Sequence, residues 1–152
     1  MTVVQWYVTQ VLGFVWRRAR WWAMLFAGAF VARTALDWFV PTADFHTRST
    51  ISTVSGAAIL LMASVWAAWR SGSIAVGPLI GVATAAAAAP MAIAGAAFLL
   101  ALRHDPMTLA TIQGSGGLAE VFTLPLIMVV PAIVLGVAGG LLGAAAHRRE
   151  SV

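Results

Sequence analysis

The sequence predicts an all-α fold: an integral membrane four-helix bundle with an N-terminal interfacial amphipathic helix. The first supporting observation is composition, because 61% of the 152 residues are hydrophobic and only 9% are charged. A soluble domain is about a quarter charged, so this composition excludes a soluble globule and a disordered chain. The second observation is that the sequence contains long runs without any charge. The third is that it lacks the apolar–polar alternation typical of membrane-spanning strands.

Four segments are candidates for transmembrane helices, which need about 20 apolar residues to cross a bilayer. Charge-free runs cover residues 49–69, 71–102 and 121–146, and a fourth segment is interrupted only by Arg33 and Asp37. We therefore predict a membrane domain over 21–147, with helices at about 21–40, 51–69, 76–102 and 119–146.

The N-terminal segment, residues 1–20, is apolar and ends in Arg17, Arg18 and Arg20. About fourteen helical residues before the basic end reach about 21 Å, which is too short to span a bilayer. A signal peptide carries its positive charges before the apolar stretch, whereas here they follow it. We expect an interfacial helix in the headgroup plane. The alternative is an N-terminal extension of the first membrane helix.

Orientation follows from the arginines, which supply every basic charge apart from histidine, since lysine is absent. With four crossings, most of the arginines lie on one side of the membrane, and only Arg48 and Arg103 lie on the other side. The positive-inside rule then puts both termini, including the tail 148–152, in the cytoplasm. An Ala-, Gly- and Arg-rich chain further suggests a bacterial inner membrane. The arginines on the cytoplasmic side are Arg17, Arg18, Arg20, Arg70, Arg148 and Arg149.

The connections are short. Residues 70–73 predict an antiparallel hairpin between the second and third membrane helices. Asp105 followed by Pro106 has the pattern of an N-cap and a first-turn proline, which predicts a short surface helix over 106–112. We expect Pro90, Pro125 and Pro131 to bend their helices.

Arg33 and Asp37 are the ionisable residues inside a predicted membrane helix, and a spacing of four puts them on one face. An intramembrane charge suggests a polar site, here for an ion or an anionic substrate. The alternative, which we favour, is an ion pair that fixes the position of the helix or of a partner. Arg33 also lies close enough to the helix end to extend toward the outer interface.

A second candidate is an outer-face polar cluster, which would bind a cation or support an enzyme. Its spacing matches no metal site, and metal ligands need convergent geometry, so we expect no metal. Glu120 has a simpler role at the start of a helix, where a carboxylate interacts favourably with the helix dipole. The members of the cluster are Asp44, His46, His104, Asp105 and Glu120.

Glycines four residues apart suggest close helix packing, because small residues let two membrane helices approach. We expect the third membrane helix to pack against the fourth, with at least one small face left for a partner. The six glycines are Gly77, Gly81, Gly136, Gly139, Gly140 and Gly143.

Several function classes are excluded by what the sequence lacks. Cysteine is absent, and no catalytic motif is recognisable. The histidines lie at span ends, which argues against a haem, and the arginines are too dispersed for nucleic acid. We predict a protein that is not an enzyme, carries no cofactor and acts by association in the lipid bilayer. It would be an accessory or scaffold subunit that binds other membrane subunits or itself. The alternative is a small oligomeric transporter or channel using Arg33, Asp37 and Glu120.

Overall fold

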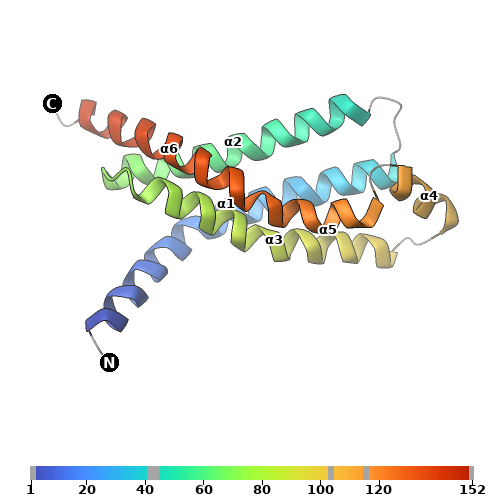
Figure 1. Ribbon diagram of the computed structural model, residues 1–152, viewed down its shortest axis with the longest axis horizontal. Helices are drawn as coiled ribbons and strands as arrows, with labels where there is room; N and C mark the ends of the chain where they lie inside the picture. Colours follow the sequence, from blue (N-terminus) through green and yellow to red (C-terminus); the bar gives the residue numbers. More distant parts are fainter. Residues whose placement is uncertain (1–2, 41–44, 103–104, 115–116, 151–152) are drawn as a thin grey trace.

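The computed structural model describes residues 3–40, 45–102, 105–114 and 117–150, and within these ranges the regular structure is entirely helical (Figure 1). The described helices are α1 (Val3–Phe39), α2 (Phe45–Ser71), α3 (Val76–Leu102), α4 (Pro106–Gly114), α5 (Gly117–Ile127) and α6 (Val129–Glu150).

Three described stretches are long and apolar enough to cross a membrane, as the sequence predicts for three of its four segments. They are Thr50–Ser71 in α2, Val76–Leu102 in α3 and Phe122–Arg149, which covers most of α5 and α6. Helix α1 is not among them. Three tryptophans and the Arg33–Asp37 pair lower the hydropathy of its second half.

Helix α1 differs from the prediction of a separate N-terminal helix, because Val3–Phe39 is one continuous helix. No glycine or proline interrupts residues 17–21, and arginine and alanine favour a helix there. The segment is therefore an extension of the helix that follows, which is the alternative raised above. Figure 1 shows its first turns diverging from the other helices. Its place relative to a bilayer stays a prediction.

Helix α2 begins six residues before the predicted start at 51, since residues 45–50 contain neither glycine nor proline. It ends at Ser71, and Gly72 follows with a φ of 65°. Glycine adopts this left-handed conformation without a steric penalty, which allows the chain to reverse. Helix α3 starts four residues later, so the predicted hairpin is confirmed.

The predicted fourth membrane helix is two helices, because the chain is interrupted at Met128. Proline has no N–H, so Pro131 removes the hydrogen bond that the Ile127 carbonyl would accept. Helical hydrogen bonds continue on either side, from the Met128 N–H to the Leu124 oxygen (3.1 Å) and from the Ala132 N–H to the Met128 oxygen (3.2 Å). Helix α3, in contrast, continues through Pro90.

Helix α4 confirms the short helix predicted after Asp105. The Asp105 Oδ1 atom accepts a hydrogen bond from the Met107 N–H at 3.1 Å, which is N-cap geometry. The helix is not purely on the surface, since Ile112 is buried against Trp38 and Ala96. Helix α4 thus covers one end of α1 and α3.

Helix α6 lies between α2 and α3 and approaches both through glycines, which we call the glycine seam (Gly77, Gly81, Gly136, Gly139, Gly140 and Gly143). A Cβ atom added at Gly77 would lie 2.5 Å from the Gly140 Cα, and one at Gly136 would lie 2.6 Å from the Pro78 Cα. On the other side, a Cβ at Gly139 would lie 2.6 Å from the Ser64 Cβ. All six glycines therefore contact helices of the same chain.

The interior is built mostly from alanines. The largest buried cluster joins Ala23 and Phe26 of α1, Leu60 of α2, Ala88 of α3 and Ala132 of α6. Small side chains bring the helix axes close together, so dispersion contacts between backbones contribute to stability. Helix α1 lies along α3 and makes a smaller contact with α2.

Candidate functional site

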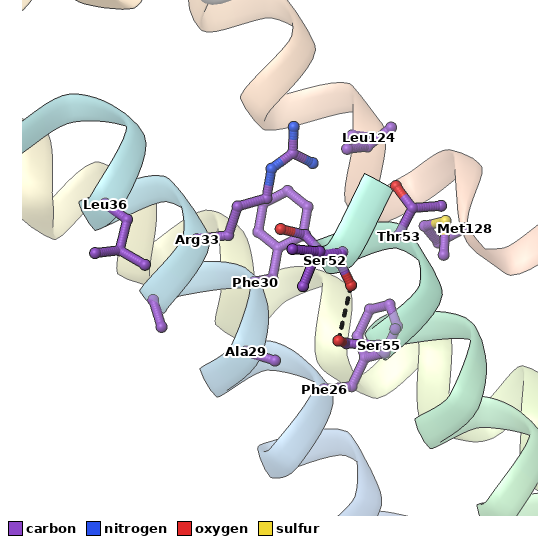
Figure 2. A pocket seen from close by; sticks show the side chains of 13 residues that line it. Phe26, Ala29, Phe30, Arg33, Leu36, Ser52, Thr53, Ser55, Leu124 and Met128 are labelled. Atoms are coloured by element: carbon purple, nitrogen blue, oxygen red, sulfur yellow. Dashed lines mark hydrogen bonds between the residues drawn. The ribbon is translucent and has the colours of Figure 1, made fainter. Parts of the chain in front are cut away.

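A pocket of about 250 Å³ lies between α1, α2 and α5, in the half of the bundle away from the α2–α3 turn. Figure 1 shows the first turns of α2 diverging from α1 in this region, and Figure 2 shows the lining side chains. Helix α1 contributes Phe26, Ala29, Phe30, Ala32, Arg33 and Leu36, α2 contributes Ile51, Ser52, Thr53, Ser55 and Gly56, and Leu124 and Met128 complete the lining.

The inner end of the pocket is apolar and depends on Gly56. A Cβ atom at Gly56 would lie 3.2 Å from the Phe26 ring and 3.9 Å from the Met128 methyl group. The absence of a side chain therefore lets the buried Phe26 ring contact α2 directly. Figure 2 shows this ring beside Ser55. The interruption at Met128 is part of the same wall, so the helix break contributes to the pocket.

Arg33 contributes a charged group to the wall and is held in an ion pair with Asp37, which is not itself a lining residue. The Arg33 Nε atom donates a hydrogen bond to the Asp37 Oδ2 atom at 3.3 Å, and the two side chains are only 10% and 9% exposed. Figure 2 shows Arg33 extending from α1 into the space beside Leu124 and Thr53. A buried ion pair costs desolvation energy, which the mutual attraction of the charges offsets.

Hydroxyl groups from α2 line the opposite side. Ser55 donates a hydrogen bond to the Ile51 carbonyl oxygen at 2.8 Å, so it is satisfied within its own helix. Ser52 and Thr53 come from the turn before it. Leu36 and Ile51 are exposed at the mouth, which opens on the flank of the bundle. The pocket is thus suited to an apolar or amphipathic group that enters from the side.

The predicted outer-face cluster cannot be assembled from the described residues. Asp44 and His104 lie outside them, as do the side chains of His46 and Glu120. Asp105 is described, and its carboxylate caps α4. Within the described part of the chain, no three histidine, aspartate or glutamate side chains come together as a metal site would require.

Sequence reasoning identified Arg33 and Asp37 but missed the rest of the pocket. The only local signal was the run of serines and threonines at 49–55, which is unusually polar for the start of a membrane helix. Phe26 and Gly56 carry no such signal, since phenylalanine and glycine are common in any membrane helix.

Comparison of the chain with protein-family models, with curated proteins and with solved structures finds no match, so the candidate site stands on its geometry alone.

Proposed function

We propose that the protein is a small multi-pass protein of a bacterial inner membrane, with residues 21–40 of α1 as a fourth crossing. Helix α1 packs along α3, an apolar helix long enough to span, which supports a transmembrane position for its second half. Residues 17–20 of α1 and the C-terminal ends of α2 and α6 carry six of the nine arginines, and we place this arginine-rich end in the cytoplasm together with both termini.

The absence of native cysteine makes this topology directly testable. A single cysteine at Ser73, in the turn between α2 and α3, should be protected from a membrane-impermeant maleimide in intact spheroplasts. A single cysteine at Gln113, in α4, should be labelled. The opposite pattern would overturn the orientation, and labelling of both before the membrane is permeabilised would contradict the four-crossing arrangement.

We further propose that the protein acts by association, as an accessory or scaffold subunit that holds a transmembrane segment of another subunit, and that it catalyses no reaction. The observation that carries this proposal is the lateral pocket, because it opens on the flank of the bundle between helices that diverge, which is the side that lipid would face in the proposed topology. An apolar floor at Phe26 and the Arg33 side chain, held in place by its ion pair with Asp37, would offer both contact area and orientation to a partner helix.

The glycine seam does not provide the surface for a partner. The sequence suggested that a small-residue face would remain for a partner, but these glycines contact helices of the same chain. The proposed partner surface is therefore the pocket and not the seam.

Site-specific photo-crosslinking tests the proposal. A photoreactive amino acid at Ile51 (62% exposed, at the pocket mouth) should yield a discrete adduct with a membrane protein, and the same probe at Phe98 (63% exposed, outside the pocket) should not. The adduct should disappear when Ala32→Phe fills the pocket. Equal adducts from both positions, or an adduct unaffected by Ala32→Phe, would count against the pocket.

The second candidate function is transport, which the Arg33–Asp37 pair inside a predicted span favours. The described interior offers few polar groups besides this pair. Thr34 and Ser64 hydrogen-bond to carbonyl oxygens of their own helices. An oligomer would therefore have to supply the path. Ion flux in liposomes that is abolished by Arg33→Gln with Asp37→Asn would support transport over association.

A further inference from the structure

Arg18 and Arg70 both lie close to the Trp66 ring, at the arginine-rich end of the bundle. The Arg18 guanidinium carbon is 5.8 Å from the centroid of this ring, and the Arg70 carbon is 5.6 Å from it. Arg18 also stacks on Phe14 at 4.1 Å, and Arg70 contacts Trp69 at 5.9 Å. Two helices thus bring two positive charges to one indole.

No described carboxylate balances these two charges, since the ion pair at Asp37 lies in the other half of the bundle. The only acidic residue that follows the arginines of α6 is Glu150, whose side chain is outside the described set. The Arg18 Nη1 atom is buried and has no hydrogen-bond partner among the described residues. Ring contacts attract a cation weakly, and a buried unpaired donor is costly. The local chemistry therefore calls for an anion.

The position of the two arginines favours a lipid as the source of that anion. Arg70 lies next to the end of the apolar stretch Thr50–Ser71, where a membrane-spanning helix meets the headgroups. Trp16, Trp21 and Trp66 are exposed around them, as is typical of indoles at the interface. Arg70 is exposed and Arg18 is only partly buried, so the site is open to the surface although the Arg18 Nη1 atom itself is enclosed.

We propose that Arg18, Arg70 and Trp66 form a binding site for the phosphate of an anionic membrane phospholipid. The guanidinium groups would donate charge-assisted hydrogen bonds to the phosphate oxygens. The indole would pack against the start of the acyl chains. The site goes beyond the proposed association through the pocket, which lies in the other half of the bundle, so either can fail without the other.

Native mass spectrometry of the delipidated protein, titrated with phosphatidylglycerol, tests the site. The first lipid should bind about fivefold more weakly to Arg18→Gln or to Arg70→Gln, and at least about twentyfold more weakly to the double variant. Arg17→Gln is the matched control, because Arg17 is a neighbouring exposed arginine whose Nε bonds to the Gly13 carbonyl oxygen. It should bind within about twofold of the original protein.

Three outcomes would overturn the proposal. Equal weakening by Arg17→Gln would show general attraction to a basic surface. Equal binding of phosphatidylcholine would show that net lipid charge is irrelevant. Competition by millimolar inorganic phosphate as strong as that by lipid would identify a free-phosphate site. Arg70 is exposed, so its variant keeps the test valid if Arg18→Gln fails to fold.

Discussion

The two sides of α2 differ in how closely a neighbouring backbone approaches. Toward α6, glycines let the two main chains come into contact. A Cβ atom at Gly143 would lie 2.8 Å from the backbone nitrogen of Trp69. Toward α1, the helices diverge around a pocket whose walls are large side chains such as Phe26, Phe30 and Leu36. The first side is suited to holding the fold together, and the second is suited to accepting something from outside.

The two sides of α2 should differ in how well they tolerate a larger side chain. Close backbone approach leaves no room for an added atom, because packed interiors transmit strain and do not absorb it. A pocket lined by flexible side chains can change volume at lower cost. Stability should therefore be most sensitive along the glycine seam, and binding should be most sensitive along the α1–α2 flank.

The largest effect is expected from bulk in the seam. Gly77→Val or Gly143→Val should lower the free energy of unfolding by about 3 kcal/mol or more, since the added carbons would meet backbone atoms. Thermal unfolding in mild detergent, followed by circular dichroism, measures this. Gly28→Val is the control, because a Cβ at Gly28 would meet no atom within 4 Å. Similar losses from all three variants would remove the distinction between seam and flank.

The next largest effect concerns the largely buried ion pair between Arg33, which lines the pocket, and Asp37. Arg33→Leu or Asp37→Leu alone should cost about 3 kcal/mol, because each removes one member of a largely buried ion pair and leaves the opposite charge in place. The double variant should recover most of that loss. A double-mutant cycle based on unfolding in detergent measures the coupling. If the two substitutions change the free energy of unfolding additively, the interaction between Arg33 and Asp37 does not contribute to stability.

The sequence predicted the seam far better than the flank, for physical reasons. Glycines four residues apart are visible in the sequence, and in membrane helices this spacing is mainly associated with close helix packing. The pocket instead combines α1, α2 and α5, and most of its residues belong to types found in every membrane helix. Only the charged pair, which is costly in such an environment, was visible beforehand.

Prolines show the same limit on prediction. Pro90 and Pro131 look alike in the sequence, and both remove one helical hydrogen bond. The break occurs only beside Pro131, where the chain passes from α5 to α6, whereas α3 contacts α1, α2, α5 and α6 and stays continuous. Sequence spacing therefore does not tell which of the two prolines lies beside a helix break.

A smaller and opposite effect is expected at Thr84 of α3. Its side chain is fully buried, and its hydroxyl has no hydrogen-bond partner among the described residues. Thr84→Val keeps the shape and removes the unsatisfied hydroxyl, so stability should rise by about 1 kcal/mol. Ser64→Ala is the comparison, because Ser64 is equally buried but bonded to the Leu60 oxygen at 2.9 Å. A loss of stability for Thr84→Val would indicate a polar contact at this hydroxyl.

The smallest change in stability is expected for a substitution at Gly28 of α1, and it should affect the isolated protein and its complex in opposite directions. Gly28→Ala adds a methyl group that meets no atom within 4 Å, so the helix should gain about 0.5 to 1 kcal/mol in detergent. Because Ala29 and Ala32 beside it line the pocket, a partner helix seated there would pass close to Gly28. The same substitution should then weaken the photo-adduct formed from Ile51 while it stabilises the protein alone. A gain in stability with an unchanged adduct would mean that the partner approaches the pocket from the α2 side.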